Sequence, residues 1–200
     1  DASSEVVLAA VSQLLQSNES MQDQLQNAKD RIQRQAMQIE SAERRAETDA
    51  LTQVPNRRAF DAYLKRRHAE GPGTAGTLAL LDVDLFKQFN DVYGHRVGDE
   101  VLRVVANVLH SHLQPYGLVA RFGGEEFAIV LDECLISEAA LKIEQVRVAI
   151  GQLVIEFEGQ PLRVAASAGV ATLIEDETVE GWLQRTDDAL YYSKDQGRNC

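Results

Sequence analysis

The sequence predicts an α/β (α+β) protein in which helices flank a central, mainly antiparallel sheet and a long coiled-coil helix precedes the domain. Three observations support this prediction. Apolar residues recur at a 3,4 spacing, without Gly or Pro, from Val7 to Ala46. Short β-prone runs then alternate with longer helical stripes along the rest of the chain. Two of these β-prone runs flank the pair Gly123-Gly124, as the strands of a hairpin flank its turn.

Length and composition indicate one domain of ordinary size with an appendage, and we assign residues 1–50 to the coiled coil and 51–200 to the domain. Of the 200 residues, 44% are hydrophobic and 26% charged, as in soluble globular proteins. The net charge of −11 argues against a nucleic-acid surface, which needs a basic stripe. An acidic protein can still bind nucleotides, because metal ions mediate its contact with phosphate.

The cysteines and the chain ends bear on the compartment. Cys134 and Cys200 lack metal-ligand spacing, which favours a reducing compartment. No run of eighteen apolar residues exists, so the sequence contains no predicted membrane span. The chain starts at Asp1 without Met, so we expect it to continue a longer protein with an upstream sensor or membrane segment. We expect a cytoplasmic location, including the cytoplasmic part of a membrane-anchored sensor.

The apolar positions of the N-terminal stretch follow a heptad pattern and favour a parallel homodimeric coiled coil. Asn18 stands at an a position, where a polar residue fixes a two-stranded register at some cost in stability. The alternative is a single amphipathic helix packed on the domain, which the narrow seam and polar remaining faces disfavour. The a positions are Val11, Asn18, Leu25, Ile32, Ile39 and Ala46, and the d positions are Val7, Leu14, Met21, Ala28, Gln35 and Ala42.

The junction between coil and domain contains Pro55. A residue that precedes proline disfavours α geometry, so we expect the first helix to end or kink before Pro55. Asn56 can then cap a new helix that runs from Arg57 to about Ala69.

The first strand of the domain is predicted over residues 78–84, a nearly continuous apolar run that ends in two acids. Asp82 and Asp84 fall on the same face at the C-terminal end of this strand. Buried carboxylates are costly unless a cation or hydrogen-bond donors satisfy them. Oxygen ligands without a nearby Cys or His cluster favour Mg²⁺ or Mn²⁺ over zinc.

The Gly123-Gly124 hairpin is the second candidate site. We expect a tight two-residue turn in which glycine supplies positive φ. A turn without side chains lets a ligand approach the backbone, here at Gly124, and the acids Glu125 and Glu126 follow at once. An ordinary surface hairpin with solvated acids is the alternative.

The remaining elements are predicted from their apolar positions. We expect a helix over residues 137–152, a hairpin over 155–164, a core strand over 164–170 and a last helix that ends near Lys194. The helix over 137–152 has Ala140, Ile143, Val146 and Ile150 as its core stripe. The last helix has Trp182, Leu183, Ala189, Leu190 and Tyr191 as its apolar face.

Four motifs together resemble the GGDEF family of diguanylate cyclases, in its Glu-Glu form, over nearly all of residues 48–200. Residues 121–127 read Arg-Phe-Gly-Gly-Glu-Glu-Phe, and residues 49–58 match the entry motif Asp-x-Leu-Thr-x-x-x-Asn-Arg-Arg. Residues 82–99 match Asp-x-Asp-x-Phe-Lys-x-x-Asn-Asp-x-x-Gly-His-x-x-Gly-Asp. The last motif, Ala-Asp-x-Ala-Leu-Tyr-x-x-Lys-x-x-Gly-Arg-Asn, has Thr186 in place of its first Ala.

This resemblance implies a palm-like nucleotidyl cyclase fold and condensation of two GTP molecules into cyclic di-GMP with release of pyrophosphate. By resemblance, Asp82, the Val83 carbonyl and Glu125 bind the metal ion. Glu125 is also the main catalytic acid, and Glu126 supports it or holds a second ion. Lys87 contacts phosphate and stabilises negative charge.

The resemblance also assigns the nucleotide contacts. Asn90 and Asp99 read the guanine edge, with His95 nearby, while Lys194 and Arg198 bind the triphosphate. Taken singly, Asn90, His95 and Asp99 also suit helix capping and turn formation. Lys194 and Arg198 equally suit a helix C-terminus, where the helix dipole favours basic residues.

One departure from the family pattern concerns control. Many members carry Arg-x-x-Asp upstream of the hairpin, a site where product binds and inhibits, whereas residues 114–117 here read Gln-Pro-Tyr-Gly. We therefore expect no product inhibition through this site and control through the coiled coil. Alternatives are a catalytically silent module that binds GTP or cyclic di-GMP, and a coil that serves as a docking stalk. The sequence has no Gly-x-x-x-x-Gly-Lys-Ser/Thr motif, which excludes a P-loop NTPase.

Overall fold

The computed structural model describes residues 21–22, 25–26, 29–35 and 46–200, and the chain separates into two units, 1–46 and 47–200. In the first unit the described residues are helical, and the predicted seam residues Met21, Leu25 and Ile32 are exposed. The rest of the predicted coiled coil, Asn18 included, lies outside the described residues. The parallel dimer therefore stays a prediction.

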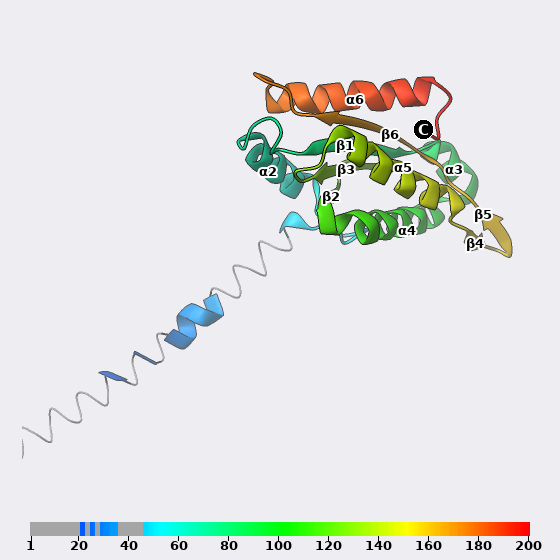
Figure 1. Ribbon diagram of the computed structural model, residues 1–200. Coiled ribbons are helices and arrows are strands. Elements are labelled where there is room, and N and C mark those ends of the chain that lie inside the picture. Colours follow the sequence, from blue (N-terminus) through cyan, green and yellow to red (C-terminus); the bar gives the residue numbers. More distant parts are fainter. Residues whose placement is uncertain (1–20, 23–24, 27–28, 36–45) are drawn as a thin grey trace, which may run out of the picture. The chain divides into compact units, whose positions relative to one another are not determined.

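The second unit is built on a four-stranded antiparallel sheet with the order β2-β3-β1-β6 (Figure 1). A separate hairpin is formed by β4 and β5. This architecture confirms the predicted fold class, including its mainly antiparallel sheet. The strands are β1 Thr77–Val83, β2 Gly117–Arg121, β3 Glu126–Leu131, β4 Ile155–Phe157, β5 Gln160–Leu162 and β6 Ala166–Thr172.

Helices cover both faces of this sheet, so the domain has three layers. One apolar cluster joins α4 and α5 to one face, and a second joins α2 and α6 to the other. Within the described residues, no helix is both long and apolar enough to cross a membrane. The helices are α2 Arg57–His68, α3 Phe86–Tyr93, α4 His95–Leu113, α5 Ile136–Gln152 and α6 Val179–Asp195, with a short 3₁₀ helix Gln114–Tyr116.

The central strand β1 decides which face carries the candidate site. All seven of its residues are buried, as predicted for a continuous apolar run. Because successive side chains alternate between faces, Leu81 and Val83 join the cluster with α4 and α5, and Leu80 joins the cluster with α2 and α6. Asp82 therefore points to the α2/α6 side.

The predicted start of α2 is confirmed. Asn56 is its N-cap, and the Asn56 side chain accepts a hydrogen bond from the Ala59 N–H at 3.2 Å. The helix ends at His68, within one residue of the predicted end.

Details of the predicted core stripes were wrong. Helix α5 begins at Ile136, and its buried stripe runs through Ala139, whereas Ala140 is exposed. The true stripe has regular spacings of four, three and four residues, which keep it on one face. Tyr191 is 71% exposed because it lies one residue beyond the buried Leu190, about 100° further around α6.

Glycine 169 permits the closest approach between α6 and the sheet. A Cβ atom there would lie 2.2 Å from Leu190 N and 2.5 Å from Thr186 O, both backbone atoms that cannot rotate away. We therefore expect Gly169→Ala to push α6 off β6 and to lower the free energy of unfolding by about 1–3 kcal/mol or more. Chemical denaturation monitored by circular dichroism measures this loss.

Gly151→Ala is the matched control for this prediction. Gly151 lies near the end of α5, and an added Cβ would meet no atom within 4 Å. Alanine in place of a helical glycine should raise stability by about 0.5–1 kcal/mol. Equal effects of the two substitutions would contradict the close packing inferred at Gly169.

Candidate active site

The turn between β2 and β3 differs from the predicted one. It spans four residues, 122–125, and neither Gly123 nor Gly124 has a positive φ. A longer turn does not demand the left-handed conformation of a two-residue hairpin. An added Cβ at Gly123 would lie 2.4 Å from Glu126 Oε2, the end of a flexible side chain that can turn aside, so space does not require glycine there. Gly124 is exposed, with no atom within 4 Å of an added Cβ, so a ligand can reach its backbone.

Two predicted acids meet where this turn crosses the end of β1. The Val83 N–H donates to the Glu125 carbonyl at 3.2 Å, which fixes the turn beside Asp82. Burial raises the pKa of Glu125, and the negative charges of Asp82 and Glu126 raise it further. Asp82 is 7% exposed, and its burial raises its pKa although Lys194 acts in the opposite direction. Both acids therefore lie where a cation would relieve their burial and repulsion.

A basic group from α6 already faces this acid pair. Lys194 Nζ lies 2.9 Å from Asp82 Oδ1. The charge of Arg198 also lowers the pKa of Asp82, so Arg198 lies within electrostatic reach of the same carboxylate. Tyr191, Lys194, Asp195 and Arg198 line a shallow hollow at this end of the helix. The structure thus brings Asp82, Glu125, Lys194 and Arg198 into one neighbourhood.

The fit to a metal ion depends on the donors at this point. Within the described residues, no three His, Cys, Asp or Glu side chains cluster as a metal site. Two carboxylates, Asp82 and Glu125, with the adjacent Val83 carbonyl make an incomplete set of hard oxygen donors, which suits an ion that completes its shell with water and phosphate. Magnesium binds in this manner.

The other predicted nucleotide-binding residues lie on α3 and α4. Lys87 and His95 are exposed, and Asn90 and Asp99 are half-buried. The Asn90 Oδ1 atom is buried without a hydrogen bond to any described group, and it packs against the backbone of Gly98. No hydrogen bond or ion pair between described residues joins these four side chains to Asp82 or Glu125. The structure places them on neighbouring elements without direct contact to the acids.

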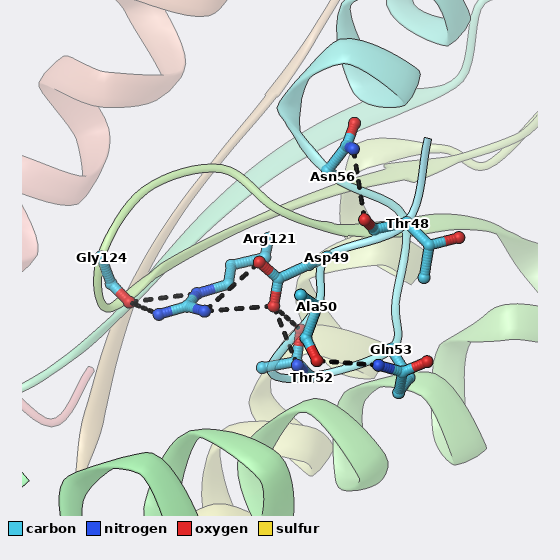
Figure 2. A network of polar contacts seen from close by, with 8 residues as sticks. All are labelled: Thr48, Asp49, Ala50, Thr52, Gln53, Asn56, Arg121 and Gly124. Atoms are coloured by element: carbon cyan, nitrogen blue, oxygen red, sulfur yellow. Dashed lines mark hydrogen bonds and ion pairs between the residues drawn. The ribbon is translucent and has the colours of Figure 1, made fainter. Parts of the chain in front are cut away.

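Arg121 on β2 contacts both the junction and the glycine turn (Figure 2). Its guanidinium donates to both carboxylate oxygens of Asp49, at 3.1 and 3.3 Å, and to the Gly124 carbonyl at 2.7 Å through Nη2 and 3.2 Å through Nε. The Asp49 Oδ1 atom also accepts from Thr52 N–H and Oγ1–H, at 2.8 and 2.6 Å. Arg121 therefore ties the junction to the glycine turn. The Asp-x-Leu-Thr motif and the arginine before the glycines were the available signals.

Comparisons with known proteins agree with this geometry. The family model described as "Diguanylate cyclase, GGDEF domain" matches residues 46–200. Diguanylate cyclase DgcP of Pseudomonas aeruginosa is 38% identical over 165 residues, which make up 80% of this chain and 24% of DgcP. Diguanylate cyclase DgcM of Escherichia coli is 38% identical over 168 residues, 80% of this chain and 39% of DgcM. The chain thus spans well under half the length of these relatives.

Solved structures show the same fold. The coiled coil and GGDEF domain of DgcB from Caulobacter crescentus, in complex with c-di-GMP, matches with a TM-score of 0.81 and 35% identity. That match covers 90% of this chain and 97% of the DgcB chain. Diguanylate cyclase SiaD of Pseudomonas aeruginosa, in complex with its activator SiaC, matches with a TM-score of 0.75 and 32% identity, over 95% of this chain and 74% of SiaD.

The Asp49–Arg121 pair predicts a pH-dependent stability. Burial raises the pKa of Asp49, but hydrogen bonds from Thr52 and Arg121 outweigh it and leave the pKa below the ordinary value of 3.8. A lowered carboxyl pKa stabilises the fold fully above that ordinary value, and the stabilisation disappears as pH falls through the folded-state pKa. We expect Asp49→Asn to lower the free energy of unfolding by about 1–3 kcal/mol at neutral pH and by progressively less in acid.

Urea unfolding at a series of pH values measures this effect. Asp61→Asn removes an exposed acid from α2 and is the control, with no pH-dependent difference expected. A deficit of Asp49→Asn that persists unchanged below pH 3.8 would show that the ionised pair does not stabilise the fold.

Proposed function

The chain belongs to the GGDEF family, and we propose that it is a diguanylate cyclase that condenses two GTP molecules into cyclic di-GMP with release of pyrophosphate. The observation that supports this most strongly is the neighbouring pair of acids, the buried Asp82 at the end of β1 and the half-buried Glu125 in the glycine turn. The pKa of each is raised, that of Glu125 partly by the charge of Asp82, and Lys194 forms an ion pair with Asp82.

We assign Asp82, Glu125 and the Val83 carbonyl as the ligands of Mg²⁺ or Mn²⁺. When bound, such an ion lowers the pKa of the attacking 3′-OH and neutralises charge on the phosphoryl oxygens. The raised pKa values of the two acids support this assignment, because a nearby cation favours their ionised forms. Glu126, the first residue of β3, directly follows Glu125 and adds negative charge that attracts a cation.

The basic residues have the complementary task. Lys194 at the end of α6 and Arg198 in the segment after it lie near Asp82 and would offset charge on the leaving pyrophosphate. Lys87 on α3 is exposed and makes no ion pair with other described residues, so its ammonium group is available to phosphate. Fixed charges of this kind stabilise a transition state without reorganisation during the reaction.

Guanine recognition is proposed for Asn90, His95 and Asp99. The Asn90 Oδ1 atom is buried against the backbone of Gly98, which restrains the orientation of the Asn90 side chain. The Asp99 carboxylate can accept from guanine N1–H and N2–H, and the Asn90 amide can donate to O6. Adenine would leave these polar groups unpaired, so the site should select strongly for guanine.

The reaction requires two domains, because each presents one GTP. We propose that a parallel coiled-coil homodimer supplies the second domain. Met21, Leu25 and Ile32 support this proposal, since these predicted seam residues are exposed in the single chain. A tether raises the effective concentration of the domains to roughly millimolar where geometry permits encounter. A coil that misaligns the domains would inhibit, and we place control there because residues 114–117 lack the charges of the product-binding motif.

Glu125→Ala tests the proposed activity. We expect the wild-type chain to form cyclic di-GMP from GTP and Mg²⁺, and the variant to lose at least about 10²–10³-fold in rate because it lacks charge stabilisation at the reacting phosphate. Chromatography of the product measures the rate. Glu156→Ala, which removes an exposed acid from β4, should leave it unchanged.

Two outcomes of this assay would oppose the proposal. A Glu125→Ala protein with wild-type turnover would remove the acid pair from catalysis. A wild-type protein that binds GTP or cyclic di-GMP but forms no product would be the silent binding module instead. Cyclic di-GMP added to the wild-type assay tests the feedback site, and no inhibition is expected.

Insertions in the coil test the proposed control. One residue inserted after Ala46 rotates the seam by about 100° relative to the domain, whereas seven residues restore the heptad phase. We expect the single insertion to change the rate of cyclic di-GMP synthesis several-fold and the seven-residue insertion to return it toward wild type. Identical rates in both variants, and in a chain that lacks residues 1–46, would exclude control through the coil.

A further inference from the structure

The last four residues lie against the ends of β1 and β6, and Asp84 is their main point of attachment. The backbone N–H of Asn199 donates to Asp84 Oδ2 at 2.9 Å and to Ser167 Oγ at 3.0 Å. The first contact joins residues 115 positions apart in the sequence, and the second joins residues 32 apart. The chain end after α6 is therefore bound next to the end of the strand that carries Asp82.

The Asp84 carboxylate is itself held in place from β6. The Ser167 hydroxyl donates to Asp84 Oδ1 at 2.8 Å and lies 3.1 Å from Oδ2, and Ser167 is fully buried. The Asp84 N–H donates to the Ala165 carbonyl at 2.9 Å, which fixes its backbone. Both carboxylate oxygens thus already have donors from the protein, which differs from the open acid pair at Asp82 and Glu125.

The attached segment has an unusual backbone. Arg198 has φ of 64° and Asn199 has φ of 54°, two consecutive residues with side chains in the left-handed region. Such conformations persist only where surrounding contacts hold them. Further contacts are present: Arg198 N–H donates to the Ser193 carbonyl at 3.2 Å, Ala168 N–H donates to the Cys200 carbonyl at 2.8 Å, and Arg147 donates to the Asn199 side chain.

The conformation decides where Arg198 lies. Asn199, which Asp84 binds, directly follows Arg198 in the chain, and Arg198 shares a hollow with Lys194 near Asp82. The Arg198 side chain has no ion pair of its own with another described residue, so its position depends on its backbone. Without the anchor at Asn199, the left-handed turn would relax and the guanidinium would leave the neighbourhood of Asp82.

We propose that Asp84 is a positioning residue that, with Ser167, holds Asn199 and thereby aims Arg198 at the phosphates of the bound nucleotide. The proposal rests on the proposed function, in which Arg198 contacts the phosphates beyond the α-phosphate. In this proposal Asp84 acts on phosphate binding indirectly, by holding Asn199 next to Arg198, and it is not a metal ligand.

A double-mutant cycle on nucleotide binding tests this proposal. The probes are a GTP analogue with sulfur on the α-phosphate, used to slow condensation, and GMP, which lacks the outer phosphates. We expect Asp84→Ala and Arg198→Ala each to weaken binding of the GTP analogue about tenfold, with GMP binding unchanged. Because both act through one contact, the double variant should bind no more weakly than Arg198→Ala.

Other variants separate positioning from general structural damage. Asp84→Asn keeps an oxygen for Asn199 N–H and an amide for Ser167 Oγ, so it should keep most of the affinity for the GTP analogue. Ser167→Ala should also weaken binding of the GTP analogue, as Asp84→Ala does. Asp188→Ala, which removes an exposed acid elsewhere on α6, should have no effect.

Three results would overturn the proposal. The first is a loss of affinity in the double variant that equals the sum of the two single losses. The second is an equal loss of affinity for GMP and for the GTP analogue. The third is recovery of the Asp84→Ala affinity at high Mg²⁺, which would make Asp84 a metal ligand. Failure of the proposed function has a different signature. A wild-type chain that binds the GTP analogue but forms no cyclic di-GMP from GTP would not be a cyclase, and the double-mutant cycle on binding would still test the role of Asp84.

Discussion

The acids Asp82 and Glu125 lie close enough for the charge of Asp82 to raise the pKa of Glu125, and this proximity organises the rest of the site. Asp82 is buried in the central strand, where an unpaired charge is costly. The turn with Glu125 is hydrogen-bonded through its backbone to the next residue of that strand, which keeps the two residues neighbours. Positive charge offsets the cost, from Lys194 at the end of α6 and from Arg198 in the segment after it.

This arrangement explains the close packing on one face of the sheet. Lys194 reaches Asp82 only because α6 lies directly on β6, where Gly169 leaves no side chain between the backbones. The alternation of β1 sends Asp82 to the face that α6 covers, while Leu81 and Val83 anchor the strand in the opposite core. The close packing of α6 on the edge strand β6 is therefore needed both for the fold and for the ion pair of the site.

Sequence patterns predicted the helices and strands and identified Asp82 and Glu125 as candidate acids. They did not predict hydrogen bonds between residues that are far apart in the sequence. Continuous apolar runs and 3.6-residue stripes identify strands and helices because burial dictates them locally. The contacts Arg121–Asp49 and Asn199–Asp84 join residues 72 and 115 positions apart, and no local pattern encodes such pairs. The glycine turn was misassigned because glycine permits several conformations, and the Gly-Gly pair alone does not distinguish a two-residue turn from the four-residue turn of the structure.

The two long-range contacts act on opposite sides of the acid pair. Arg121 joins the Gly124 carbonyl to Asp49, and its own N–H donates to the Pro55 carbonyl at 2.8 Å, so the turn that carries Glu125 is coupled to the junction at two points. Asp84 joins the chain end to β1, which neighbours no junction residue in the sheet. The turn that carries Glu125 and the chain end that carries Arg198 are therefore held by separate contacts, so the fold positions the two sides of the acid pair independently.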